Sequence, residues 1–279
     1  MRARAQLALL GIVGLTLIAD PAEAAGRELR VCADPNNLPF SNREGEGFEN
    51  RIAELLAEEL DARLSYTWWA QRRGFIRNTL NAGACDVVIG VPAGYELVET
   101  TTPYYRSAYV YVYRADLGLD LHSIRDPRLH DLRIGVHLIG DDGANPPPAH
   151  ALGAQGIVDN VVGFMIYGDY REPNPPARVI EAVAAGELDV AAVWGPFGGY
   201  FARHAAVPLA AVPITDTAAF APLRFEFGVA MGVRKDDRGL LDELNGIIER
   251  RREDIHALLD TYAVPRVVPS GTFEEQEAR

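Results

Sequence analysis

The order of apolar and polar positions predicts a first unit of alternating strands and helices between residues 29 and 91. Two amphipathic segments, residues 47–61 and 72–83, repeat apolar side chains at helical spacing and are predicted as helices. Around them lie near-continuous apolar runs, which are typical of strands in a parallel sheet covered by helices on both faces. These strands are predicted at residues 29–34, 63–69 and 85–91.

A second unit of the same kind follows a strand with two different faces. Residues 107–114, SAYVYVYR, alternate tyrosine with valine, and we interpret them as the strand that leaves the first lobe. Helices are then predicted at residues 149–155 and 176–187, the latter with prolines at its start and Gly186 at its end. The strands of this unit are predicted at residues 132–138, 161–167, 189–195 and 209–214.

The C-terminal part is predicted to return to the first lobe. Residues 224–234 alternate like a strand, and residues 239–264 repeat apolar side chains at helical spacing. The chain then crosses between lobes twice, near residues 113–118 and 214–222, which makes a hinge. We therefore predict an α/β protein of two lobes, each a mostly parallel sheet with helices on both faces. The first lobe comprises residues 26–114 and 222–268, the second residues 115–221, and residues 269–279 form a flexible tail.

The N-terminus has the pattern of a cleaved secretory signal. Arg2 and Arg4 precede an apolar run at residues 7–19, and small residues follow it. We predict a signal peptide over residues 1–25, with a single N-terminal anchor as the alternative. No later segment reaches the roughly 20 apolar residues of a membrane span, so we expect no membrane insertion of the mature chain.

Charge and motif content exclude several classes of function. The formal net charge is −12 at pH 7, which argues against nucleic acid as a partner. Nucleophile elbows, phosphate loops and the ligand spacings of zinc or calcium sites are missing, so we predict no catalysis, cofactor or metal. A dehydratase built on the same fold is the minor alternative. Cys32 and Cys85 are predicted to form a disulfide in an oxidising compartment, with free buried thiols as the alternative.

Several stretches carry a resemblance to a known family. CADPNNLPFSN, GFEN, LIGDDGANPPPAHAL, IYGDY and DVAAVWGP occur in the same order as in the MoxJ/XoxJ group, which this chain resembles. These are periplasmic binding-protein-like components associated with PQQ-dependent methanol dehydrogenases. The resemblance implies the two-lobed type II periplasmic binding-protein fold. It also implies a periplasmic accessory protein that binds a PQQ-dependent methanol or alcohol dehydrogenase and assists its maturation or activation, with the cytochrome c of that system as a second candidate partner.

The chain departs from the amino-acid binders of this fold. Those proteins hold the ligand carboxylate with an arginine after the third strand, and the amine with a carboxylate on the second lobe. Here Gly94 and Tyr95 stand around the first position, and Trp194 and Gly195 around the second. A zwitterion would leave its charges poorly paired on closure, which disfavours an amino-acid ligand. A transporter-linked binder of a small non-amino-acid ligand stays open as the alternative function.

The candidate binding residues come from the loops beyond the carboxyl ends of the predicted strands, where such folds meet their ligands. Their aromatic, proline and arginine content favours a protein interface over a small polar pocket. Trp68 and Trp194 are alternatively core residues at strand ends, and the proline run is alternatively a rigid entry to a helix. The candidates are Asn36, Asn37, Phe40, Trp68, Trp69, Arg72, Tyr95, Asp141, Asp142, Pro147, Trp194, Phe197 and Tyr200.

Overall fold

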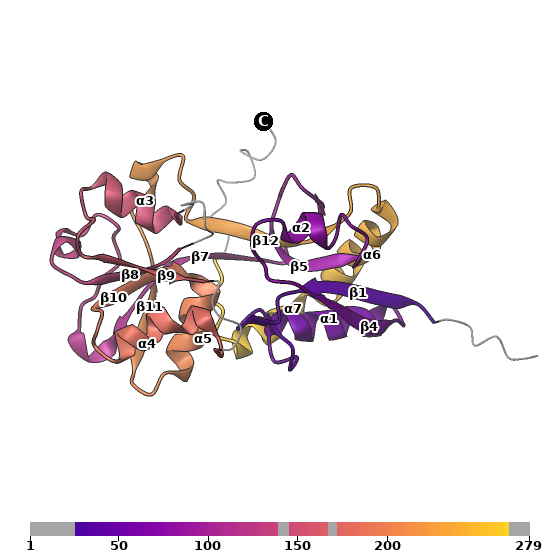
Figure 1. Cartoon of the computed structure of the whole chain (residues 1–279), viewed down its shortest axis with the longest axis horizontal. Helices are drawn as coiled ribbons and strands as arrows, with labels where there is room; N and C mark the ends of the chain where they lie inside the picture. Colours follow the sequence, from indigo (N-terminus) through magenta and orange to yellow (C-terminus); the bar gives the residue numbers. More distant parts are fainter. Residues whose placement is uncertain (1–25, 139–144, 167–171, 268–279) are drawn as a thin grey trace, which may run out of the picture.

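The chain folds into two lobes joined by two long strands (Figure 1). The computed structural model describes residues 26–138, 145–166 and 172–267. The joining strands are β7 (Tyr105–Arg114) and β12 (Glu226–Val233), and through them a single ten-stranded sheet runs across both lobes. Within the described parts of the chain, no helix has the length and apolar content that a membrane crossing requires.

The first lobe is built on three parallel strands that the sequence predicts. Strand β1 lies between β4 and β5, and β12 pairs antiparallel with β5. Helices α1, α6 and α7 share one apolar core on one face, while α2 packs with the two cysteines on the other. The elements are β1 (Glu28–Ala33), α1 (Phe48–Glu59), β4 (Arg63–Trp68), α2 (Phe75–Asn78), β5 (Val87–Pro92), α6 (Arg238–Arg250) and α7 (Arg252–Thr261), with the short strands β2 (Asn36–Asn37), β3 (Ser41–Asn42) and β6 (Glu99–Thr100).

The second lobe repeats this arrangement. Strands β9, β8 and β10 are parallel, and β7 and β11 complete the sheet in antiparallel orientation. Helix α3 packs against one face, and α4 and α5 against the other. The elements are β8 (Ile134–Leu138), α3 (Pro147–Ala154), β9 (Val161–Met165), α4 (Arg178–Ala184), β10 (Val190–Trp194), α5 (Gly195–His204) and β11 (Leu209–Pro213), with single turns of 3-10 helix at Ala115–Leu117, Pro127–His130, Pro175–Ala177 and Thr217–Phe220.

Two predicted helices differ from the structure. The segment 72–83 forms only the single turn of α2, because Thr79 leaves helical geometry and its Oγ1 donates to the carbonyl oxygen of Phe75 at 2.7 Å. The predicted helix 239–264 is two helices that break at Arg251. The charged run between Ile248 and Ile255 offers the core no apolar side chain, and Arg251 instead pairs with Glu59 of α1 at 2.7 Å.

Strand β7 changes partners in its middle. Residues Tyr105 to Ala108 pair with β12 in the first lobe, and residues Tyr109 to Arg114 pair with β10 and β11 in the second. The pairing therefore changes between Ala108 and Tyr109, earlier than the predicted crossing near residues 113–118. The lobe boundaries drawn from the sequence stay a prediction, because strand pairing alone does not define rigid bodies.

The C-terminal segment lies beside this hinge and contacts both lobes. Ser107 Oγ donates to the carbonyl oxygen of Pro265 at 2.6 Å, close to the point where β7 changes partners. On the second lobe, the backbone of Ala263 lies directly against Gly199 of α5. A Cβ atom added to this glycine would be only 2.0 Å from the carbonyl oxygen of Ala263. The rings of Tyr200 and Tyr262 stack with centroids 5.8 Å apart. The end of the described chain thus packs closely on α5 and on the hinge.

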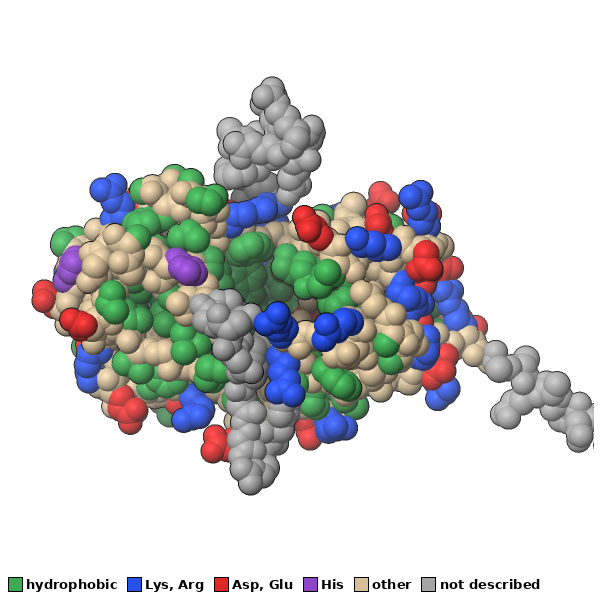
Figure 2. Space-filling model, turned by 45° about the horizontal axis from the view of Figure 1, so that its top comes forward, with side chains coloured by type: hydrophobic (Ala, Val, Ile, Leu, Met, Phe, Trp, Pro, Cys, Tyr) green, Lys and Arg blue, Asp and Glu red, His purple; other side chains and the backbone are tan. Residues whose placement is uncertain are grey.

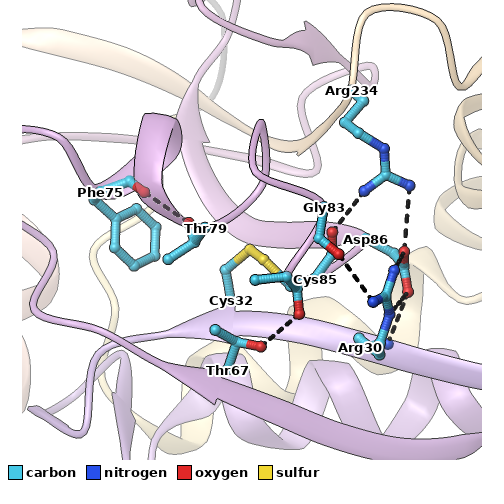
Figure 3. The surroundings of a disulfide bond; sticks show 10 residues. Arg30, Cys32, Thr67, Phe75, Thr79, Gly83, Cys85, Asp86 and Arg234 are labelled. Carbon is cyan, nitrogen blue, oxygen red and sulfur yellow. Dashed lines mark hydrogen bonds and ion pairs between the residues drawn. A yellow bond between two sulfur atoms is a disulfide. The ribbon is translucent and has the colours of Figure 1, made fainter.

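The predicted disulfide is present between Cys32 of β1 and Cys85, just before β5 (Figure 3). Next to it, the carboxylate of Asp86 accepts hydrogen bonds from Arg30 Nε at 2.9 Å and from Arg234 Nη2 at 3.2 Å. The covalent bond and the ion pairs together join three neighbouring strands, β1, β5 and β12. These strands carry two of the loops that form the site described below.

Candidate functional site

A cavity of about 630 Å³ lies between the two lobes. Figure 2 shows the hollow between the lobes, with hydrophobic side chains on its walls. Its size is that of a typical small-molecule pocket. Its described lining consists of Asn37, Phe40, Glu49, Gln71, Arg72, Arg73, Gly74, Phe75, Ile76, Gly90, Val91, Pro92, Tyr95, Leu97, Tyr105, Tyr109, His137, Pro146, Ile166, Trp194, Phe197, Phe227 and Val229.

Aromatic rings from both lobes form the walls. Phe40 of the first lobe meets Phe197 of α5 edge to face, with ring centroids 4.9 Å apart. Trp194 ends β10 and lies 5.4 Å from Tyr109 and 5.8 Å from Phe227. Its half-buried ring packs against the cores of both lobes, so it is both a wall of the cavity and a core residue. Edge-to-face packing fixes these rings without a ligand.

Glu49 contributes a buried carboxyl group to the cavity lining. Glu49 is the second residue of α1 and is 7 % exposed. Its side chain lies against Gly90 of β5, where a Cβ atom added to the glycine would be only 2.1 Å from Oε1 of Glu49. Burial raises the pKa of Glu49 to about 8, and the neighbouring carboxylate of Asp34 adds to this. The carboxyl group is therefore mainly protonated at neutral pH and is able to donate a hydrogen bond.

His137 reaches the cavity from the end of β8. The ring is 3 % exposed, and its Nε2 lies 3.0 Å from the carbonyl oxygen of Pro176. A carbonyl oxygen only accepts, so Nε2 carries the hydrogen and Nδ1 presents a lone pair. Burial lowers the pKa of His137 to about 4, against the opposing effect of the Pro176 carbonyl, so the ring is neutral at pH 7.

Three buried polar atoms of residues that line the cavity have no hydrogen-bond partner in the described part of the chain: Asn37 Oδ1, Tyr105 Oη and His137 Nδ1. The other end of the Asn37 amide is fixed, because Nδ2 donates to Gln71 Oε1 at 3.2 Å. Burial, with the nearby Glu49, raises the pKa of Tyr105 well above its ordinary value, so this hydroxyl keeps its proton. Buried polar groups in folded proteins usually have partners, so these three atoms are exceptions, and all three belong to residues of the cavity lining.

The candidates from the sequence divide into two groups. Those that line the cavity are Asn37, Phe40, Arg72, Tyr95, Trp194 and Phe197. Those outside its lining are Asn36, Trp68, Trp69, Pro147 and Tyr200, while Asp141 and Asp142 lie outside the described residues. The predicted binding roles of all these residues stay predictions.

The second group has other contacts. Asn36 joins the lobes at the edge of the cavity: its Nδ2 donates to the carbonyl oxygen of Glu172 at 2.8 Å, and its Oδ1 accepts from the backbone nitrogen of Asn174 at 3.0 Å. Trp68 lies on β4, at the edge of the sheet, where its ring stacks on Tyr66 at 4.6 Å. Trp69 is 43 % exposed.

The proline run enters a helix, as the alternative interpretation of the sequence states. Helix α3 begins at Pro147, with Pro146 in the N-cap position. The predicted start at Ala149 is two residues late, because prolines fit the first helical positions, whose backbone nitrogens need no partner within the helix. Pro146 also lines the cavity, so this run contributes to a wall of the cleft as well.

Glu49, Tyr105 and His137 are functional candidates that the sequence does not single out. The motif GFEN contains Glu49, but an acidic residue in the first turn of a helix is ordinary, because it stabilises the helix dipole. Tyr105 and His137 lie in apolar strands, where a buried aromatic residue is expected. Only their convergence on one cavity distinguishes them.

Comparison with known proteins identifies the class. Residues 29–264 match the family of bacterial extracellular solute-binding proteins, family 3, and the chain belongs to this family. It is 33 % identical over 258 residues to protein MoxJ of Methylorubrum extorquens. The aligned region covers 88 % of this chain and 84 % of that relative.

Two solved structures extend this similarity. Periplasmic binding protein XoxJ from Methylobacterium extorquens AM1 has 38 % identity and a TM-score of 0.71, covering 86 % of this chain and 99 % of the relative. MxaJ from Methlophaga aminisulfidivorans has 29 % identity and a TM-score of 0.75, covering 86 % of this chain and all of the relative, 100 %. The predicted type II periplasmic binding-protein fold and the predicted resemblance to the MoxJ/XoxJ group are confirmed.

The neutral state of His137 leads to a testable pH dependence. Its pKa in the folded protein, about 4, is below its ordinary value of 6.5, so the native state binds fewer protons between these values. The free energy of unfolding is therefore expected to decrease by up to about 3 kcal/mol as the pH falls from 6.5 to about 4. We expect His137→Gln to remove this loss, measured as the difference in urea unfolding free energy between the two proteins across the window. The exposed His150→Gln is the matched control, and an equal pH response in both variants would contradict the assignment.

Proposed function

We propose that this protein is a periplasmic accessory protein that binds a PQQ-dependent methanol or alcohol dehydrogenase and assists its maturation or activation. The observation that carries the proposal is the aromatic wall at the two positions where amino-acid binders of this fold place opposite charges. Tyr95 and Trp194 line the cavity there. A free amino acid would lose the hydration of its charges without gaining ionic partners at these positions.

The relatives support this function over nutrient uptake. Protein MoxJ, XoxJ and MxaJ match along most of this chain, and the stretches that carry the resemblance include residues of the cavity lining. A binding role without catalysis agrees with the solute-binding family. The predicted signal peptide over residues 1–25 would deliver the chain to the periplasm, where the Cys32–Cys85 disulfide is stable.

Exposed apolar side chains near the cleft are the candidate docking surface for the dehydrogenase. Leu97 is 51 % exposed and Tyr95 is 36 % exposed, and both also line the cavity. Trp69 follows β4 on the same lobe, and Arg72 lies three residues further along the chain. Tryptophan, tyrosine and arginine are the residues that most often anchor protein interfaces.

Binding to the cognate dehydrogenase tests the proposal. The mature protein is immobilised, and the apo and holo forms of the enzyme and its cytochrome c are passed over it in separate biolayer interferometry runs. We expect dehydrogenase binding, weakened about tenfold or more by Trp69→Ala and by Tyr95→Ala. Val158→Ala, which truncates a 61 % exposed side chain on the other lobe, is the control and is expected to bind like the wild type. Absence of binding to both enzyme forms would refute the proposed function.

A further inference from the structure

We propose that residues 262–267 form a strap that holds the two lobes at a fixed angle and prevents the cleft from opening by rotation about the hinge. This role goes beyond the proposed function, since it concerns the relative motion of the lobes and requires no dehydrogenase. Figure 1 shows this end of the described chain, in yellow, beside β7 where the lobes meet. The strap is anchored in the first lobe and packs against α5 of the second.

The two strands that join the lobes cross at the same level of the sheet. Ala108, the last residue of β7 that pairs with β12, lies opposite Glu226, the first residue of β12. From Tyr109 onward, β7 pairs with strands of the second lobe. Rotation of the lobes therefore needs backbone changes at only a few residues, as in other hinged proteins. Contacts outside these two strands must supply any restraint on the angle between the lobes.

The strap is fixed to the first lobe at several points. Val264 is 4 % exposed and belongs to the apolar core of that lobe. Two hydrogen bonds attach the strap to β7 just before the hinge. Ser107 Oγ donates to the carbonyl oxygen of Pro265 at 2.6 Å, and the backbone nitrogen of Val267 donates to the carbonyl oxygen of Arg106 at 3.0 Å. The strap therefore moves with the first lobe.

Two glycines allow α5 of the second lobe to lie directly against the strap and the hinge. Gly195 and Gly199 are four residues apart and so share one face of α5. A Cβ atom added to Gly199 would lie 2.0 Å from the carbonyl oxygen of Ala263 and 3.0 Å from Cδ of Pro265. At Gly195 it would lie 2.5 Å from the carbonyl oxygen of Ala108. Glycine weakens the interior of a helix, yet no side chain fits at Gly199 in this packing.

These contacts oppose rotation in both directions. Gly199 and Ala263 meet through backbone atoms, which have no side-chain rotamers to change and so do not adjust easily. A rotation that moves α5 toward the strap would force these atoms to overlap. A rotation away from it would separate the stacked rings of Tyr200 and Tyr262, whose centroids are 5.8 Å apart, and expose their apolar faces to water. The strap therefore favours one angle between the lobes.

The backbone of Ala263 supports a role for this contact. Its φ angle is 52°, in the left-handed region that favours glycine. An alanine in this region persists only where the surrounding packing offsets the strain. The turn follows the end of α7 and brings the carbonyl oxygen of Ala263 onto Gly199. The strained residue is thus the one that makes the closest contact between the strap and the second lobe.

Distance measurements between the lobes test the proposal. Double electron–electron resonance is recorded on the mature protein with nitroxide labels on two introduced cysteines, Glu58→Cys in α1 and Glu181→Cys in α4, both at exposed positions. The native cysteines form the disulfide and do not take the label. We expect one narrow distance distribution. Deletion of residues 265–279 removes both hydrogen bonds to β7 and is expected to add a second population at a different distance. Deletion of residues 268–279 leaves the strap intact and is the control.

Two matched glycine variants isolate the contact with α5. Gly199→Ala places a Cβ atom against the strap and is expected to produce a second distance population as well. Gly153→Ala in α3 is its control, because a Cβ atom there would meet no atom within 4 Å. Both substitutions replace glycine by alanine within a helix, so their effects on helix propensity are alike. Circular dichroism and the Tm report whether each variant is folded. If the truncated protein fails to fold, the two glycine variants still decide.

An unchanged distance distribution after deletion of residues 265–279 would overturn the proposal. A wild-type distribution as broad as that of the truncated protein would also overturn it, because the strap would then restrain nothing. Equal distributions for Gly199→Ala and Gly153→Ala would contradict the assigned contact with α5. No dehydrogenase is present in these measurements, so their outcome is separate from that of the proposed function.

Discussion

The free energy of unfolding is expected to fall by up to about 5 kcal/mol as the pH rises from about 4.5 to above 8, owing to Glu49 alone. Burial raises the pKa of this carboxyl group from 4.5 to about 8, so the native state holds a proton that the unfolded chain has released. The stabilisation is complete below the unfolded value and is lost as the pH passes through the folded one. Urea unfolding at several pH values between about 5 and 9 measures it.

The Glu49→Gln variant separates this effect from other titrations. Glutamine resembles the protonated carboxyl group in shape, so the variant is expected to lose the decline in stability between about pH 6.5 and pH 9. Below pH 6.5 the titration of His137 changes the free energy of unfolding in the opposite direction. The range from about pH 6.5 to pH 9 therefore reports on Glu49 without this contribution. Glu58→Gln, at an exposed position of the same helix, is the control. A decline of the same size in both variants would show that Glu49 does not carry the proton.

Loss of the Cys32–Cys85 disulfide is expected to lower the free energy of unfolding by about 4 kcal/mol. The two cysteines are 53 residues apart. Opening a loop of this length increases the entropy of the unfolded chain, which stabilises the unfolded state by about 4 kcal/mol. Urea unfolding of the Cys32→Ala, Cys85→Ala double variant is the measurement. The wild type in dithiothreitol should match it, and the double variant should be insensitive to dithiothreitol. Equal stability of the double variant and the oxidised wild type would contradict the prediction.

The disulfide also bears on the cavity. Cys32 lies on β1, which leads into the loop of Asn37, and Cys85 precedes β5, which ends beside Tyr95. Asn37 and Tyr95 both line the cavity. The bond therefore joins the end of β1, where the loop of Asn37 begins, to the segment that enters β5, and its loss is expected to loosen that loop as well as the core.

Much of the fold is readable from the sequence because burial imposes periodic patterns. The parallel strands are short apolar runs, and β7 alternates tyrosine with valine because its two faces pack against different cores. Boundaries that depend on single side chains are less accessible. Thr79 ends α2 through a hydrogen bond to its own helix, and the break at Arg251 follows from an ion pair with Glu59, a residue of a distant helix.

By itself, the sequence determined the alternation of strands and helices and the pairing of the two cysteines, and it placed Tyr95 in the loop after one strand and Trp194 at the end of another. These properties are local, since each depends on which residue stands at a position and on its near neighbours. Only the tertiary structure brought Glu49, Tyr105 and His137 to one cavity and shifted the pKa of each. Those shifts arise from burial, which depends on how segments far apart in the chain pack against each other.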